Sequence, residues 1–572
     1  MRNKIALLLL ILIVGCKQDA APEQNQTSTW WKEAIIYQIY PRSFQDTDGD
    51  GIGDIKGIIE QLDYVKSLGV TAVWLNPIYT SPNDDNGYDV SDYRGIMADF
   101  GTMADFDEML KQMHNRDIKL IMDIVVNHSS DEHEWFKQSS SSRDNPYRNY
   151  YHWWPAEKGK PNYRYSLFDV QGDAWAFDST TNAYYLHYFS KKQPDLNWSN
   201  PKVRQEVIDI MKFWAEKGVD GFRLDAFQFA AKDTTYPAFP EGFEKNFIDY
   251  YAMQDGLHDY LKEMNEKVFL PYGVMSVAEG AGRNFDDAHA LVDENRKELN
   301  MAYAFDGGDI AKYGGYDLLK FKEVFSRWDS AFAQKGWLSI FLSNHDQARL
   351  VSRFGNDSDE FRMASSSMLQ TFILSMRGTP YCYYGDEIGM TNIHFDNINQ
   401  YRDIAAINGY KKAVAEYQDM GLFMQKLNFE SRDNGRTPMQ WNDSSQAGFT
   451  KGKPWLPVHE NHARINVKIQ DHDPKSVLNY FRKMTKLRKD NPTLIYGNYT
   501  MLDKNNRDVY AYTRQWKGEK LLVLLNFRAK NVNISMPELK STNQILINNF
   551  QSFDVSNSRA TLLPFQAVII KI

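Results

Sequence analysis

The sequence contains very little cysteine, with only Cys16 and Cys382 among 572 residues. A disulfide framework is therefore excluded, because a single intramolecular bridge would need Cys16, and we expect none. Cys382 lies in the apolar stretch PYCYYG (380–385). We expect it to be a packed and inert thiol.

A cluster of basic residues is also absent. The 66 Lys and Arg residues are scattered, and 74 Asp and Glu residues give a net charge of −8. This balance argues against nucleic acid or an anionic membrane surface as a partner, and favours a neutral substrate. Aromatic residues make up 14% of the chain and suit sugar rings, although a large aromatic core accounts for most of them.

Long apolar runs are missing except for one near the start. Ile5–Val14 follows Arg2 and Lys4, is too short to span a bilayer, and is typical of a signal peptide. It ends in Ile-Val-Gly-Cys, which resembles a bacterial lipobox, so we expect removal of residues 1–15, lipidation of Cys16 and a tether over 16–29. This predicts a lipid-anchored protein of the bacterial cell envelope, periplasmic or on the outer-membrane surface. Ordinary secretory cleavage nearby is the alternative.

From about residue 33, short β-type runs alternate with amphipathic helical stretches, a pattern that predicts an α/β fold with a (β/α)8 TIM barrel. A helix is expected over 200–217, which opens with Asn-Pro and is followed by Gly218. Six strands are clear, an eighth is plausible at 381–385, and one is located only loosely, near 301–306. The clear strands are expected at 34–40, 70–76, 118–126, 219–224, 273–278 and 338–343.

Two segments depart from this rhythm. Residues 129–195 are rich in Ser, Asn, Tyr and Trp, and predict an inserted domain after the third strand. Residues 493–572 change to alternating strands, with DVYAYTRQW and KLLVLLNF joined by a short turn, which predicts a C-terminal antiparallel β-sandwich. The barrel is therefore expected to comprise 30–128 and 196–492.

Four short segments at the ends of apolar runs carry acidic and histidine side chains. They are DIVVNH (123–128), GFRLDA (221–226), SVAEG (276–280) and FLSNHD (341–346). Arg223 and Asp225 are two residues apart on a strand and so share one face. Paired carboxylates on a rigid parallel scaffold are what cleavage of a glycosidic bond requires.

These segments, with QPDLN (193–197) and GVTAVWLNPIY (69–79), resemble the motifs of the α-amylase family, glycoside hydrolase family 13. The likeness covers about residues 30–572. QPDLN is similar to the marker of the oligo-1,6-glucosidase subfamily, whose members are mostly exo-acting α-glucosidases. SVAEG and LFDVQGDAW depart from the usual family pattern. The resemblance therefore predicts the donor pocket but not the mode of acceptor binding.

The resemblance implies a role for each motif residue. Asp225 is expected to be the nucleophile, kept ionised by Arg223, and Glu279 the general acid/base. Asp346 would bind ring hydroxyls and complete the triad. A strand-end salt bridge at Asp225 and a helix-starting glutamate at Glu279 are the structural alternatives.

The same resemblance implies a pocket for one glucose. Tyr88 would stack under the sugar, and His128 and His345 would bind its hydroxyls, since no third ligand with metal spacing lies near them. Asp89 and Arg436 would pair across the non-reducing end, which implies exo action. As the alternative, Asp89 caps a turn after Gly87.

The expected function is a retaining exo-acting α-glucosidase that releases glucose from maltose and maltooligosaccharides by double displacement. Ala226 follows the nucleophile, where subfamily members with α-1,6 activity carry valine, so we expect preference for α-1,4 over α-1,6, with sucrose also open. Alternatives are a trehalose- or isomaltulose-forming transglucosidase, an oligo-1,6-glucosidase, an endo-acting amylase and a non-enzymatic glucan-binding surface lipoprotein. The last should lack a triad carboxylate.

A separate acidic loop spans 46–54, with the sequence DTDGDGIGD. Aspartates at near-alternate positions with intervening glycines supply oxygen ligands for a hard cation, and Ca²⁺ is expected in a structural role. Mg²⁺ and a solvated acidic turn are the alternatives. By resemblance to the subfamily, the ligands would be Asp46, Asp48, Asp50, Asp54 and the carbonyl of Ile52.

Overall fold

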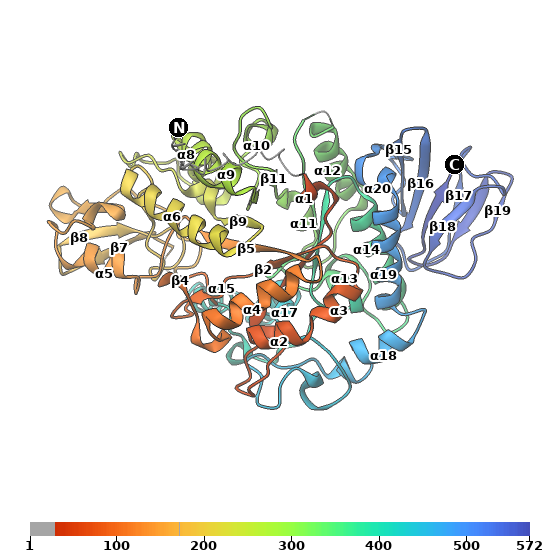
Figure 1. The fold of residues 1–572 in the computed structure, drawn as a ribbon, viewed down its shortest axis with the longest axis horizontal. Coiled ribbons are helices and arrows are strands. Elements are labelled where there is room, and N and C mark those ends of the chain that lie inside the picture. The colour runs from red at the N-terminus through yellow and green to blue at the C-terminus, as the bar shows by residue number, and fades with distance from the viewer. Residues whose placement is uncertain (1–28, 171, 334) are drawn as a thin grey trace, which may run out of the picture.

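The computed structural model describes residues 29–170, 172–333 and 335–572. The molecule is elongated, with parallel strands and helices in the middle, strands β7 and β8 at one end and the C-terminal strands at the other (Figure 1). The predicted signal peptide, lipidation at Cys16 and nearly all of the tether lie outside the described residues. Within the described ranges, no helix is long and apolar enough to cross a bilayer.

Eight parallel strands form the central sheet and confirm the predicted barrel. Their hydrogen-bonded order is β11-β10-β9-β5-β2-β1-β13-β12, and a parallel bridge between Ala302 and Leu338 joins the two edges. Each strand overlaps a predicted run, including the two that the sequence indicated least clearly. The strands are β1 (Ile36–Ile39), β2 (Ala72–Leu75), β5 (Lys119–Val125), β9 (Gly221–Asp225), β10 (Met275–Ala278), β11 (Met301–Ala302), β12 (Ser339–Ile340) and β13 (Thr379–Tyr383).

Helices follow the strands and surround the sheet (Figure 1). Helix α6 (Pro201–Lys217) begins after Asn200, whose side chain accepts a hydrogen bond from the Lys202 N–H, and ends at Gly218 with φ 106°. These ends match the predicted start and stop signals. Other helices are α2 (Ile55–Glu60), α3 (Leu62–Ser67), α4 (Met103–His114), α8 (Leu257–Met264), α10 (Phe285–Val292), α12 (Leu318–Ala331), α14 (Arg362–Ser375) and α19 (Val477–Asp490).

Between β5 and α6 the chain forms helix α5 (Glu134–Ser141) and a small antiparallel sheet in the order β6-β8-β7. A buried ion pair, 3.2 Å from Lys232 Nζ to Asp195 Oδ2, fastens the end of this segment to the loop after β9. The side chain of Asn127 also donates to Asp195, at 3.1 Å. The strands are β6 (Trp153–Pro155), β7 (Trp175–Asp178) and β8 (Ala183–Leu186).

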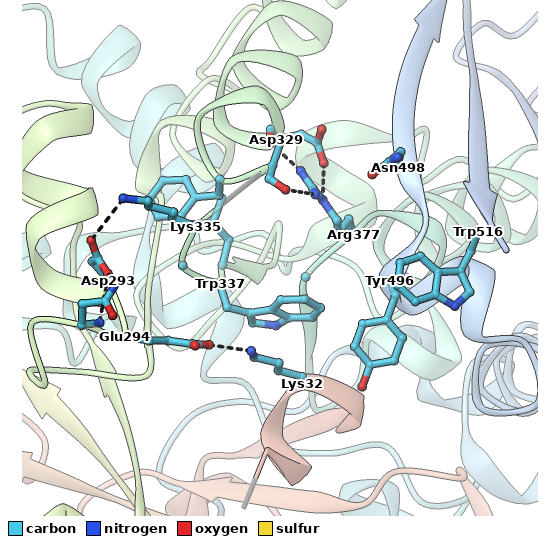
Figure 2. A pocket seen from close by; sticks show the side chains of 16 residues that line it. Lys32, Asp293, Glu294, Asp329, Lys335, Trp337, Arg377, Tyr496, Asn498 and Trp516 are labelled. Carbon is cyan, nitrogen blue, oxygen red and sulfur yellow. Dashed lines mark hydrogen bonds and ion pairs between the residues drawn. The ribbon is translucent and has the colours of Figure 1, made fainter. Parts of the chain in front are cut away.

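After α20 (Pro492–Tyr496) the chain forms two antiparallel sheets, ordered β14-β15-β16-β21-β18 and β17-β20-β19. Strands β15 (Val509–Trp516) and β16 (Glu519–Asn526) form the predicted hairpin. A cavity of about 390 Å³ lies where Tyr496, Asn498 and Trp516 meet the barrel (Figure 2). The remaining strands are β14 (Asn498–Leu502), β17 (Val532–Ser535), β18 (Gln544–Asn548), β19 (Val555–Ser556), β20 (Arg559–Leu562) and β21 (Ala567–Lys571).

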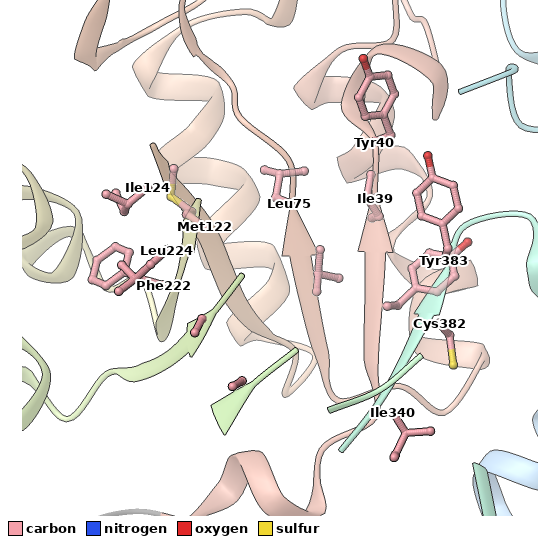
Figure 3. Close-up of a cluster of buried hydrophobic side chains, with 14 of the residues drawn as sticks. Ile39, Tyr40, Leu75, Met122, Ile124, Phe222, Leu224, Ile340, Cys382 and Tyr383 are labelled. Carbon is pink, nitrogen blue, oxygen red and sulfur yellow. The ribbon is translucent and has the colours of Figure 1, made fainter. Parts of the chain in front are cut away.

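Alternation along the barrel strands divides the buried side chains between two cores. Ile39, Leu75 and Leu224 come from three different strands and belong to the large cluster that includes residues of the surrounding helices (Figure 3). The alternate positions, such as Ile36 and Trp74, belong to a separate cluster. Since successive side chains of a strand face opposite sides, this second cluster fills the barrel interior.

Candidate active site

Three carboxylates stand at the carboxyl-terminal end of the barrel strands. Asp225 is the last residue of β9, Glu279 follows β10, and Asp346 lies in the loop after β12. Their side chains are 10%, 19% and 32% exposed, respectively. Because parallel strands end at one edge of the barrel, segments far apart in sequence meet there.

Arg223 binds two of these carboxylates at once. Its Nη1 lies 2.5 Å from Asp225 Oδ1 and its Nη2 lies 2.5 Å from Glu279 Oε1. The same Nη1 is 2.8 Å from Asp123 Oδ1, on the neighbouring strand β5. Asp225 and Glu279 therefore cannot be farther apart than one guanidinium and two hydrogen bonds allow. They are close enough to flank one sugar.

The residue after Asp225 also orients Glu279. Ala226 is buried, has φ 46°, and its N–H donates to Glu279 Oε2 at 2.7 Å. A left-handed conformation is uncommon for a residue other than glycine, and here it aims the amide at Glu279. On the same side, the buried Oε1 of Gln228 has no hydrogen-bond partner within the described residues. A Cβ at Gly280 would come within 2.9 Å of that side chain.

The pKa values of the two acids differ in the order that a proton donor and a nucleophile need. Burial raises the pKa of Glu279 to about 8 and that of Asp225 to about 7, although Arg223 lowers both. The expectation that Arg223 holds the pKa of Asp225 low is therefore wrong in its net direction. The pKa of Asp225 is raised because Asp225 is buried and shares the one positive charge of Arg223 with Asp123 and Glu279. The negative charge of Asp123 raises the pKa of Asp225 further.

Asp346 lies beside two arginines and a histidine. Arg432 Nη1 and Arg436 Nη2 are each 3.0 Å from its Oδ1, and His345 Nε2 is 3.2 Å from its Oδ2. Burial raises the pKa of Asp346, but His345 and the two arginines outweigh burial and bring it below its ordinary value. Asp346 is therefore ionised while Glu279 holds a proton.

Tyr88 contacts both His128 and His345, and His345 borders Asp346. The Tyr88 ring stacks on His345, with centroids 5.2 Å apart and planes at 12°, and its hydroxyl donates to Asp123 Oδ2 at 2.9 Å. His128 Nε2 is 3.1 Å from the Tyr88 carbonyl oxygen and from Gln193 Nε2. Burial lowers the pKa of His128 to about 3, so its ring is neutral.

The predicted pairing of Asp89 with Arg436 is wrong. The carboxylate of Asp89 accepts hydrogen bonds from the Ser81 hydroxyl and from the backbone N–H groups of Asp84 and Asp85, at 2.9–3.0 Å. Asp89 thus stabilises the turn, as the alternative interpretation held. Arg436 instead donates to Asp346 and to the backbone carbonyl of His345.

Asp85 and Arg432 form the acid–arginine pair that the sequence assigned to Asp89 and Arg436. Arg432 Nη2 lies 3.4 Å from Asp85 Oδ1, and Arg432 also bonds Asp403 and Asp346. Gln193 Nε2 donates to Asp85 Oδ2 at 3.0 Å, which connects this pair to His128. Asp85 stands four residues before Asp89 and Arg432 four residues before Arg436. Sequence position alone did not distinguish which acid and which arginine face the pocket.

The acidic loop brings together three of its four aspartates. Carboxylate oxygens of Asp46, Asp48 and Asp50 lie within 4.8 Å of one another. Asp54 is not in this group, contrary to the predicted ligand set, because its oxygens accept from the Thr47 and Gly57 N–H groups, and the second of these bonds caps α2. The N–H of Ile52 donates to Asp50 at 2.7 Å.

Comparisons with known proteins decide the family. Residues 38–497 match the model of the α-amylase catalytic domain, and residues 499–569 match the C-terminal domain of maltogenic amylase. The chain belongs to the α-amylase family, glycoside hydrolase family 13. This glycoside hydrolase is 48% identical to the oligo-1,6-glucosidase of Parageobacillus thermoglucosidasius over 95% of its own length and 99% of the relative, and it belongs to that subfamily.

Other relatives of this family 13 glucosidase have different activities. The trehalose-6-phosphate hydrolase of Bacillus subtilis (strain 168) is 41% identical, over 96% of this chain and 99% of the relative. Among solved structures, the isomaltulose synthase from Klebsiella sp. LX3 superposes with a TM-score of 0.91 at 42% identity, over 95% of this chain and 99% of that one. The shared barrel therefore serves several glucosyl chemistries.

The role of the Asp85–Arg432 pair in the pocket can be tested by comparing Asp85→Ala with Asp89→Ala. Asp85→Ala removes a partner of Arg432 and Gln193, and we expect kcat/KM for 4-nitrophenyl α-glucoside to fall by about tenfold to hundredfold. The change in Tm should be small, because Arg432 keeps Asp346 and Asp403 and Gln193 keeps His128. Asp89→Ala leaves buried donors unpaired, so its main effect should be a Tm lower by several degrees. A loss of kcat/KM confined to Asp89→Ala would contradict the reassignment.

Proposed function

We propose that this enzyme is a retaining, exo-acting α-glucosidase that releases glucose from the non-reducing end of maltose and maltooligosaccharides. The observation that carries the proposal is the single guanidinium that binds both Asp225 and Glu279. In retaining glycosidases the two carboxyl groups are about 5–5.5 Å apart and leave no room for a water between them. The shared guanidinium favours such a short separation, so we expect the first step to form a covalent glucosyl-enzyme.

In this mechanism Asp225 attacks the anomeric carbon while Glu279 protonates the leaving oxygen. The leaving sugar departs with that proton, and Glu279 then removes a proton from the attacking water, which restores both acids. The higher pKa of Glu279 supports this division of roles. Asp346, ionised between Arg432 and Arg436, binds ring hydroxyls of the glucose.

The exo action is supported by the Asp85–Arg432 pair. Arg432 is only 16% exposed and Asp85 6%, and Gln193 and His128 extend the same buried network. Charged groups that hydrogen-bond one another beside the triad close the donor end, and a longer chain cannot pass through. His128 and Tyr88 supply the remaining donor-side contacts.

The preference for α-1,4 links over α-1,6 is proposed from Ala226. Its side chain is buried next to Asp225 in the chain, and a methyl group in place of the isopropyl group of valine reshapes the acceptor side. The second candidate is oligo-1,6-glucosidase activity, which the names of several relatives at 42–48% identity favour. A transglucosidase that forms isomaltulose is a further candidate, supported by the solved structures.

Product analysis on maltose, isomaltose, sucrose, trehalose and soluble starch tests this proposal. We expect α-glucose as the first product, a higher kcat/KM on maltose than on isomaltose, and little action on starch. Asp225→Asn should lose activity by at least about a thousandfold. Isomaltose as the better substrate would overturn the linkage assignment, and a disaccharide as the main product would overturn hydrolysis.

The pKa order predicts a bell-shaped pH profile of kcat/KM. Below a pKa of about 7, Asp225 is protonated and cannot attack, and above about 8, Glu279 has lost its proton. Asp123→Asn removes a negative neighbour of Asp225, which favours the ionised carboxylate, so the acidic limb should move to lower pH. An acidic limb that stays in place or rises would contradict the shared-charge account.

We further propose that the loop around Asp46, Asp48 and Asp50 binds a structural Ca²⁺. Clustered carboxylate oxygens suit a hard cation, and neighbouring Asp48 and Asp46 add to the effect of burial in raising the pKa of Asp50. The loop packs on a distant segment, since Thr450 donates to Asp46 and the Trp455 N–H donates to the Gly51 carbonyl. The ion would therefore stabilise this contact, away from the triad.

Removal of the ion with EDTA should lower Tm, and added Ca²⁺ should restore it. At a Ca²⁺ concentration of about 100 Kd, the stabilisation is about 2.7 kcal/mol. Asp48→Asn should lose the Ca²⁺ response while kcat for maltose at 25 °C stays within about twofold. An equal response to Ca²⁺ in that variant would rule out this loop as the site.

The cellular location is also a proposal. The lipobox-like sequence before Cys16 supports a lipid anchor that holds the enzyme at the cell envelope.

A further inference from the structure

We propose that the cavity between the barrel and the C-terminal sheets is a second carbohydrate site, which holds a neutral α-glucan chain without cleaving it (Figure 2). This goes beyond the proposed hydrolysis, because the cavity contains none of Asp225, Glu279 and Asp346. It has a volume of about 390 Å³.

The cavity lies at the opposite end of the barrel from the triad. Its lining includes Leu338 and Gly378, which immediately precede β12 and β13, and Lys32, which precedes β1. The triad residues stand at or after the carboxyl ends of their strands. In a parallel barrel the two groups therefore lie on opposite faces, so a ligand in the cavity cannot belong to the donor or acceptor side of the catalytic site.

The charges around the cavity are paired with one another. Lys32 Nζ is 2.8 Å from Glu294, Arg377 Nε is 2.8 Å from Asp329, and Lys335 Nζ is 4.0 Å from Asp293. Figure 2 draws these pairs at the wall of the cavity. With three cations and three anions matched, the described residues of the lining offer no unpaired charge to a phosphate or a carboxylate. A neutral ligand fits this balance.

Aromatic rings form one side of the cavity. Tyr496 lies between Trp337 and Trp516, with ring centroids 5.9 Å and 5.7 Å away. All three side chains are partly exposed. Trp337 is held in place, because its Nε1 donates to Thr379 at 2.8 Å and Lys32 Nζ lies 5.6 Å from its ring centroid. Rigid aromatic faces next to polar groups suit sugar rings, which have apolar faces and hydroxyl edges.

Two polar groups in this lining are available to hydroxyls. Among the described residues, neither the indole N–H of Trp516 nor the side-chain amide of Asn498 has a hydrogen-bond partner. Both belong to the C-terminal sheet, where Asn498 pairs with Gln515, the neighbour of Trp516. An amide supplies a donor and an acceptor, and the indole supplies a donor, which matches hydroxyl groups and not a purely apolar ligand.

Native electrophoresis in gels with and without soluble starch tests the site, with the full chain in detergent and Asp225→Asn in every variant to prevent hydrolysis. We expect starch to retard this parent. Adding Trp516→Ala should weaken the apparent affinity for starch by at least about tenfold. Trp154→Ala is the matched control, since Trp154 is also partly exposed and lies 5.3 Å from a lysine Nζ, in the inserted domain. It should be retarded like the parent.

Adding Asp85→Ala should leave the retardation in place, because it weakens only the catalytic pocket. Without the Asp225→Asn change, Trp516→Ala should hydrolyse maltose with kcat/KM within about twofold of the unaltered enzyme. A parent that starch does not retard would overturn the second site. So would retardation that survives Trp516→Ala, or that disappears with Asp85→Ala. Failure of the unaltered enzyme to hydrolyse maltose would count against the proposed function. The gel result would still test the second site on its own.

Discussion

One buried positive charge, that of Arg223, is the constraint on which the site depends. Its guanidinium is 2% exposed and contacts Asp123, Asp225 and Glu279. Three ionised carboxylates around one cation would leave excess negative charge out of water, which is costly. The site therefore retains a proton near neutral pH, and the pKa order assigns that proton to Glu279. The same arginine limits the spacing of the acids and lowers the pKa of each.

The barrel makes this arrangement possible. Arg223 and Asp225 share the inward face of β9, while Phe222 and Leu224 pack in the outer core. Asp123 pairs in register with Arg223 from strand β5. Strands of a closed sheet fix such side chains more firmly than a loop would, so the charges are preorganised before substrate binds. The more exposed Asp346 comes from a loop, where two arginines supply the rigidity.

Much of this could be predicted from the sequence because the relevant signals are local. Apolar runs located six strands clearly and the other two only loosely, and Asn200 with Gly218 marked the ends of α6. The errors concern choices among similar neighbours: Asp85 or Asp89, Arg432 or Arg436, and whether Asp54 faces the cluster or caps a helix. Each of these choices depends on how a turn directs its side chains in three dimensions, which local sequence does not specify. The direction of the pKa shift of Asp225 could not be predicted because Arg223 also contacts Asp123. That contact joins two strands that are distant in sequence.

The most direct test of the account is to identify the carboxylate that becomes glucosylated. A 5-fluoro-α-glucosyl fluoride has a leaving group that needs no protonation, so the enzyme should accumulate a covalent intermediate that mass spectrometry of a peptic digest can locate. We predict one glucosyl group on Asp225, formed also by Glu279→Gln and absent from Asp225→Asn. Label on another carboxylate, or turnover with inversion and no label, would contradict the account.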